Sequence, residues 1–174
     1  EINGSGTKES KDTPDLWIKE RLNEASQKVN SYFEEFRFDL ATQTIYDFIW
    51  NEFCDWYIEI CKIRFSSPDY QESEKKAILK SLISTLEESL RLAHPIMPFI
   101  TEEIWQQFKP EHVNKSPSIM ISKYPTGKTK KASKTMNDIE WVKEIVTSIR
   151  NIRGEMKIKP SLKISALLQQ GNRT

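Results

Sequence analysis

Ile45–Phe65, IYDFIWNEFCDWYIEICKIRF, is the stretch that decides the fold class of this chain. It holds 14 apolar or aromatic residues in 21 positions, and neither glycine nor proline. A surface helix needs only one apolar stripe, so a helix that is apolar nearly all round must be buried on several sides. Four of its charged residues recur every three or four positions, which places them on one edge of the helix: Glu52, Asp55, Glu59 and Lys62. The stretch therefore predicts the central helix of a bundle, with most of its aromatic side chains in the core.

A second helix is predicted before this stretch. Thr13 followed by Pro14 is typical of a helix start, with a capping hydroxyl and then proline in the first turn. Apolar residues then recur at helical spacing up to Phe36. Asp39 is placed to cap the central helix itself.

Two further helices are predicted after it. The first runs from about Glu72 to Ala93 and is ended by Pro95. A shorter helix begins near Pro98 and should fold back onto the bundle through four apolar side chains: Phe99, Ile100, Ile104 and Trp105. Because all the connections are short, neighbouring helices should be antiparallel.

The pattern changes beyond residue 108. Ser118–Ser122 reads as a short strand, and Thr126–Thr135 as a lysine-rich linker. A helix is expected from Asn137, which has Glu140 three positions on, to about Gly154. Alternation over Leu162–Leu168 predicts a second strand. The predicted fold is mainly α: a disordered leader over residues 1–12, an antiparallel helical bundle over 13–108, and a small α/β appendage over 109–174.

Charge is distributed unevenly along the chain. Residues 1–122 hold 14 basic and 21 acidic side chains, whereas residues 123–174 hold 12 basic and 4 acidic ones. An anionic partner should therefore approach the C-terminal third, although a solvated lysine loop would give the same count.

Catalytic and metal-binding patterns are not found in the sequence. His94 and His112 are the only histidines and have no partner pattern, and Cys54 and Cys61 fit neither a zinc site nor a redox pair. We expect both thiols to be reduced in a cytoplasmic protein. KASKT at Lys131–Thr135 is similar to an ATP-handling loop of class I aminoacyl-tRNA synthetases, but no nucleotide-binding sheet accompanies it, so we interpret it as linker. No apolar run is long enough to cross a membrane.

Basic residues on and after the last predicted helix are the best candidates for binding RNA. Arginine and lysine neutralise phosphates, and exposed aromatic rings stack on unpaired bases. The candidate residues are Lys143, Arg150, Asn151, Arg153, Lys157 and Lys159. For most of the cluster of Trp50, Trp56 and Tyr57, core packing is the better interpretation.

Four motifs, in order, resemble the anticodon-binding domain of bacterial valyl-tRNA synthetases, which are class I aminoacyl-tRNA synthetases. They lie at Arg37–Lys62, Leu90–Gln106, Ser118–Pro125 and Ile149–Ser161. The resemblance spans Leu16–Leu168. Isoleucyl- and leucyl-tRNA synthetases share the bundle, but Cys-Asp-Trp-Tyr at Cys54–Tyr57 looks like the valine enzyme.

The resemblance implies a tRNA-binding piece of a longer, cytoplasmic, monomeric ligase that attaches valine to its tRNA. Its catalytic region, which uses ATP with Mg²⁺, would precede residue 1, and a coiled-coil arm would follow residue 174; no cofactor is expected in the piece itself. It also implies that a helix preceding residue 1 contributes to anticodon contact.

The resemblance also assigns roles to residues of the first and last motifs. Arg37, Asn51 and Asp55 would mostly fix the bundle. Independently of the resemblance, Glu59 lies four residues after Asp55 and forms an unfavourable like-charge pair with it, so we expect Asp55 to have a basic partner such as Arg37 or Arg91. Arg150, Asn151 and Arg153 match the family's Arg-Asn-x-Arg, where contact with RNA and anchoring of the tail both remain open. The alternative from another class is a helical protein-interaction module with an exposed apolar groove and no affinity for RNA.

Overall fold

The computed structural model describes residues 8–108, 116–127, 134–159 and 161–165. The chain divides into two compact units, Glu1–Met136 and Asn137–Thr174, which are described separately. Four expectations fall wholly or partly outside the described residues: the first seven residues of the leader predicted over residues 1–12, His112, most of the lysine-rich linker, and the last three residues of the strand predicted over Leu162–Leu168.

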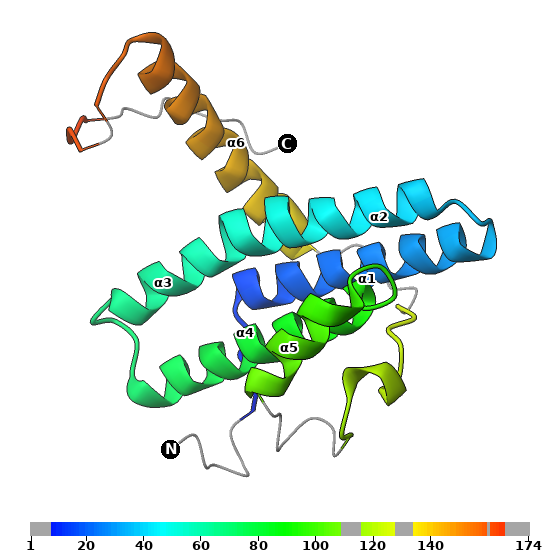
Figure 1. Ribbon diagram of the computed structural model, residues 1–174. Coiled ribbons are helices and arrows are strands. Elements are labelled where there is room, and N and C mark those ends of the chain that lie inside the picture. The colour runs from blue at the N-terminus through cyan, green and yellow to red at the C-terminus, as the bar shows by residue number, and fades with distance from the viewer. Residues whose placement is uncertain (1–7, 109–115, 128–133, 160, 166–174) are drawn as a thin grey trace. The chain divides into compact units, whose positions relative to one another are not determined.

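The first unit is the predicted helical bundle (Figure 1). The two long neighbours, α1 and the helix formed by α2, η1 and α3, lie side by side and are joined by a tight turn. The helices in chain order are α1 Thr13–Glu34, α2 Phe38–Tyr46, η1 Asp47–Ile58, α3 Glu59–Ser66, α4 Glu72–Ala93 and α5 Pro98–Phe108. The predicted central helix and the two helices after it are confirmed.

Two of the predicted caps are wrong. The N-cap of α1 is Asp12 instead of Thr13, and α2 begins at Phe38 after an Arg37 N-cap, so Asp39 lies inside the helix. The carboxylate of Asp39 accepts two hydrogen bonds from the Arg37 guanidinium. At the start of α4, Gln71 and Glu74 form a reciprocal capping box, which the sequence analysis did not predict.

The turn from α1 to α2 is a Schellman motif with phenylalanine in the position usual for glycine. Phe36 has φ 58°, the Arg37 N–H donates to the Tyr32 carbonyl at 2.8 Å, and the Phe36 N–H donates to the Phe33 carbonyl at 3.2 Å. The left-handed turn directs Phe36 to the surface, with 78% of the residue exposed. The expectation that the apolar line of α1 extends to Phe36 is therefore wrong, and Val29 is its last buried residue.

The core is formed by the facing sides of the helices. Trp17, Ile18 and Val29 of α1, Tyr57 of η1 and Ile78 of α4 are each 0% exposed. The packing expected for α5 is only half right. Its Trp105 is buried, but Phe99 and Ile100 are 91% and 53% exposed.

A π-helical segment, η1, sets which face of the central helix is buried. Buried residues along α2, η1 and α3 are separated by three or four positions except once, between Phe48 and Phe53, where the step is five: the full set is Ala41, Ile45, Phe48, Phe53, Tyr57, Cys61 and Arg64. A π-helix forms i→i+5 hydrogen bonds and so accommodates this step. Had the α-helical spacing continued, the inward line would have been Glu52, Asp55, Glu59 and Lys62. The π-helix thus turns Asp55, Glu59 and Lys62 outward and brings Tyr57 and Arg64 into the bundle.

Aromatic residues of this helix divide between core and surface. Tyr57 is buried as expected, and Trp56 is half-buried. Trp50 is 56% exposed and stacks on Tyr46, with 6.3 Å between ring centroids and 13° between ring planes. Trp50 is thus not part of the core.

The segment after α5 was expected to hold a strand, and this expectation is wrong. Ile119–Ile121 is a 3₁₀ turn, η2, whose N-cap Ser118 accepts a hydrogen bond from the Met120 N–H. The Ile119 N–H donates to the carboxylate of Glu102 at 3.1 Å. Side chains take these two main-chain donors, which a strand ladder would otherwise use.

The second unit contains most of α6, Lys134–Glu155, which begins three residues before the expected Asn137 and ends beside Gly154. Another Schellman motif follows, with Lys157 at φ 52° and the Ile158 N–H donating to the Arg153 carbonyl at 2.9 Å. Residues 162–165 are not a strand, and residues 166–168 lie outside the described part. Over the described ranges the chain contains no β-strand, so the predicted α/β character of the appendage is not found.

Candidate nucleic-acid interface

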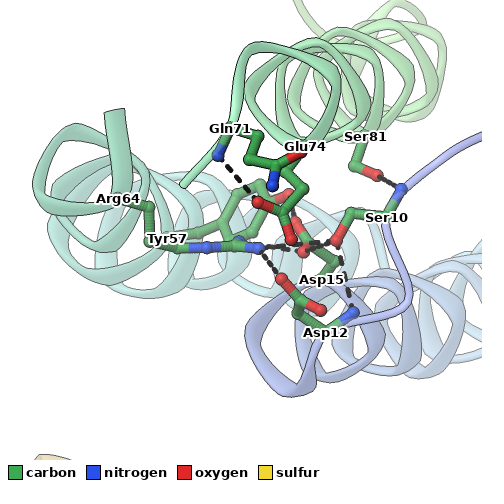
Figure 2. A network of polar contacts seen from close by, with 8 residues as sticks. All are labelled: Ser10, Asp12, Asp15, Tyr57, Arg64, Gln71, Glu74 and Ser81. Atoms are coloured by element: carbon green, nitrogen blue, oxygen red, sulfur yellow. Dashed lines mark hydrogen bonds and ion pairs between the residues drawn. The ribbon is translucent and has the colours of Figure 1, made fainter. Parts of the chain in front are cut away.

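One end of the bundle holds a buried polar network (Figure 2). The Asp15 carboxylate, 0% exposed, accepts from Tyr57 Oη at 2.5 Å, Arg64 Nη1 at 2.9 Å and Ser10 Oγ at 2.6 Å. Arg64 also pairs with Asp12, and the Ser10 N–H donates to Ser81 Oγ at 3.0 Å. The network therefore ties the N-terminal segment, α1, η1, α3 and α4 together.

This network was missed in the sequence, although a signal was present. Asp15 lies three residues before Ile18 on the apolar line of α1, and Arg64 lies three residues after Cys61 on the apolar line of α3. Two opposite charges at inward positions of facing helices predict a buried ion pair. Burial together with the hydrogen bond to Asp15 raises the pKa of Tyr57, so this hydroxyl stays protonated and donates.

The other arginines in the described bundle also face carboxylates. Arg21 pairs with Glu52 and Glu24, and Arg37 with Asp39. Arg91 holds Glu87 through two hydrogen bonds of 2.8 Å. The Arg37 hydrogen bonds lower the pKa of the Asp39 carboxyl to about 2. In the bundle, then, carboxylates balance the guanidinium charges.

The two arginines expected as partners of Asp55 are paired with other carboxylates. Arg37 and Arg91 pair with Asp39 and Glu87, so neither is the partner expected for Asp55. Asp55 is exposed, and the exposed Asn51 amide donates to the Asp47 carboxylate at 3.2 Å.

The basic candidates of the second unit lie along α6 and the turn after it. Lys143, Arg150 and Arg153 are separated by seven and three positions, which places them on one side of the helix. Asn151 is exposed on the adjacent face. Lys143 pairs with Glu140 at 3.0 Å, so part of its charge is balanced within the helix.

The end of α6 places the remaining candidates. Arg153 Nη2 donates to the carbonyls of Lys159 and Leu162, at 2.6 and 3.1 Å, and so closes the turn. Lys157 and Lys159 are exposed on that turn, although Lys157 lies beyond the helix instead of continuing its face. A carbonyl has no net charge, so these bonds orient the Arg153 guanidinium without neutralising it. Arg153 therefore keeps its positive charge on the same turn as Lys157 and Lys159.

The other candidate chemistries receive little support. His94 Nδ1 is 2.7 Å from Thr101 Oγ1 at the turn from α4 to α5. Cys54 and Cys61 are free thiols, and burial raises the pKa of Cys61 to about 11. Within the described ranges, no group of histidine, cysteine or acidic residues could hold a metal ion, and no helix could span a membrane.

A shallow pocket lies where the α1–α2 turn meets the end of α4. Its volume is about 600 Å³, and its lining is mostly apolar: Asn30, Phe33, Phe38, Thr42, Pro95, Ile96 and Tyr124. The Phe33 ring is tilted by about 50° to those of Phe38 and Tyr124. This pocket is the nearest feature in the described bundle to the groove that a protein-interaction module would use.

Comparison with known proteins places the chain in a family. Residues 15–168 match the family described as "Anticodon-binding domain of tRNA ligase". The chain is 43% identical over 157 residues to a valine--tRNA ligase of Acinetobacter baylyi, and 40% identical over 158 residues to that of Psychrobacter arcticus. Each alignment covers 90% of this chain and 16% of the relative, so the chain spans about a sixth of the length of these relatives. The chain belongs to the family of anticodon-binding domains of tRNA ligases.

Proposed function

We propose that this chain is the tRNA-binding part of a valine--tRNA ligase. Valine--tRNA ligases of several bacteria align with nearly the whole chain, which supports the choice of amino acid. The longer enzyme would join valine to its tRNA with ATP and Mg²⁺, in a region outside these residues. We expect it to be a cytoplasmic monomer.

The proposal gives the two parts of the chain different tasks. Residues 13–108 would form the scaffold, and residues 109–174 would bring positive charge to the tRNA. The observation that carries this assignment is the basic side of α6, where Arg153 is held by carbonyls instead of carboxylates. Arg150, Asn151 and Arg153 would contact the tRNA directly, with Lys143, Lys157 and Lys159 adding to the field.

A filter-binding comparison tests the proposal. We expect the 174-residue chain to bind valine tRNA weakly at low salt, with an affinity that falls steeply as salt is added. The same titration with tRNAs altered in the anticodon asks whether the chain itself discriminates among them. If only the longer ligase discriminates, specificity depends on residues outside this chain.

A protein-interaction module is the rival from another class. It would bind a helix or peptide in the apolar pocket and show no RNA affinity even at low salt. Absence of binding to valine tRNA at low salt, with the chain folded by circular dichroism, would favour this rival.

A further inference from the structure

We propose that residues 117–127 act as a strap that fixes where the lysine-rich chain leaves the bundle, and that this fixed point strengthens tRNA binding. The inference rests on the proposed tRNA-binding function and adds positioning residues to it. The strap contains no regular helix apart from η2, yet it is held by side chains of α5, α4 and α1.

The first attachment is to α5. Glu102 accepts hydrogen bonds from Ser118 Oγ at 2.8 Å and from the Ile119 N–H at 3.1 Å, and the Gln106 amide donates to the Pro117 carbonyl at 2.8 Å. Beside it, Ile119 is 3% exposed and packs with Leu90 and Trp105. Polar and apolar contacts therefore hold this end of the strap.

The second attachment is to α4, through a guanidinium that is itself held in place. Glu87 is 3% exposed and fixes Arg91 through two bonds of 2.8 Å, and the Trp105 indole N–H lies 3.3 Å from the same carboxylate. Arg91 Nη1 then donates to the Lys123 carbonyl. The adjacent Tyr124 hydroxyl donates to the Leu92 carbonyl at 2.9 Å. A preoriented arginine bonds the strap with little further loss of side-chain entropy.

The third attachment is to α1. The Asn30 amide donates to the carbonyl of Pro125 at 2.8 Å and also to that of Ser26 at 2.6 Å. Gly127 follows at φ +68°, pressed against α1 so closely that a Cβ would lie 2.6 Å from Gln27 Cγ and 2.7 Å from the Asn23 carbonyl oxygen. Only glycine combines a positive φ with so close an approach to α1 without displacing neighbouring atoms. The chain therefore leaves the bundle at a defined place on α1.

The position of the strap matters because the chain changes there from a net negative to a net positive charge. Residues 123–136 contain five lysines and no acidic residue, whereas residues 1–122 carry seven more acidic than basic side chains. Salt limits the range of a charge to about 8–10 Å, so its attraction for a phosphate depends on where it is held. The strap also holds the exposed Lys123 and the start of the basic segment at one place on the bundle, so their charge is presented to a bound tRNA from a fixed origin.

The test compares two variants, in each of which one glycine is replaced by alanine. Gly127→Ala should force the strap from α1, whereas Gly154→Ala is the matched control because its Cβ would meet nothing within 4 Å. Binding of fluorescently labelled valine tRNA is measured by anisotropy over a range of salt. We expect Gly127→Ala to raise Kd about three- to tenfold at every salt concentration, with the slope of log K against log salt unchanged because the same phosphates are contacted. The control should bind like the wild type.

A second variant guards against misfolding. The pair Asn30→Ala and Tyr124→Phe removes two attachments without a steric clash, and should raise both Kd and hydrogen exchange over residues 117–127. Unchanged exchange in both variants would overturn the strap, and increased exchange with an unchanged Kd would overturn its role in binding. If the wild type itself binds no tRNA, the proposed function fails, which is a different result from equal binding by all variants.

Discussion

The bundle and the C-terminal unit use arginine in opposite ways. In the bundle, the buried Arg64 forms ion pairs with Asp15 and Asp12, and Arg91 forms an ion pair with Glu87. In the C-terminal unit, Arg153 donates to two carbonyls at the end of α6. Carboxylates neutralise the arginines of the bundle, whereas the carbonyls that bind Arg153 leave its positive charge in place. Composition alone cannot separate these roles, because it counts every arginine alike.

The largest effect is expected where charge is buried. Asp15→Ala leaves Arg64 in the interior without its fully buried partner, which should lower the free energy of unfolding by about 3–5 kcal/mol in urea titrations. Arg37→Ala removes an ion pair whose side chains are 52% and 64% exposed, and should lower the free energy of unfolding far less, because solvent screens this pair. Equal losses in the two variants would contradict the contrast between buried and exposed pairs.

A pair of isoleucines in the strap separates core from surface. Ile119 is 3% exposed and Ile121 is 69% exposed, two residues apart. Ile119→Ala should destabilise the bundle by about 2–4 kcal/mol, because it opens a cavity beside Trp105. Ile121→Ala should change stability by less than about 0.5 kcal/mol. Thermal denaturation of the two variants measures the difference, and similar midpoints would mean that the strap is not packed against the bundle.

The turn from α1 to α2 should tolerate glycine better than phenylalanine. A left-handed conformation costs a side-chain-bearing residue about 1–2 kcal/mol, while glycine loses about 0.5–1 kcal/mol in chain entropy. Because Phe36 is 78% exposed, Phe36→Gly should raise the free energy of unfolding by about 0.5 kcal/mol. Lys157, at the end of α6, also has a positive φ, so Lys157→Gly should have a similar effect. Destabilisation by Phe36→Gly in urea titrations would show that the ring has packing partners that outweigh the strain.

A further effect concerns alkaline pH. Burial raises the pKa of Cys61 to about 11, so folding favours the neutral thiol. Its contribution is complete below the pKa of an unfolded thiol, about 8.5, and is lost as pH rises towards the folded value. The urea midpoint should therefore fall from about pH 8.5 to about pH 10, and less so in Cys61→Ala. An identical decline in both proteins would assign the effect to another group.

Much of the bundle could be predicted because apolar periodicity is a direct record of burial. The bounds of α4, Glu72–Ala93, agree with the helix read from its apolar line and from Pro95. The inward face of the central helix could not be read in this way, because the step of five from Phe48 to Phe53 matches no α-helical period. Strand patterns were misleading at Ser118–Ser122, where hydrogen bonds donated to Glu102 of α5 decide the local structure.

The candidate interface was predictable only in part. The excess of positive charge after residue 122 is visible in the sequence, and the structure places Arg150 and Arg153 on one side of α6. The bonds that hold Arg153 join residues up to nine positions apart in a turn without a sequence signature. The buried network of Asp15 and Arg64 joins residues 49 positions apart, and only the packing of α1 against the long helix formed by α2, η1 and α3 brings them together.

We expect residues 109–174, and not the helices of the bundle, to neutralise the phosphates of tRNA. The most direct measurement is the slope of log K against log salt for valine tRNA in two double variants that each remove two positive charges. Arg150→Ala with Arg153→Ala should reduce the slope by about 2, since each lost phosphate contact removes about 0.9. Arg37→Ala with Lys62→Ala, both exposed and paired with carboxylates, should leave it unchanged. Equal changes in the two double variants, or a change only in the second, would contradict the account.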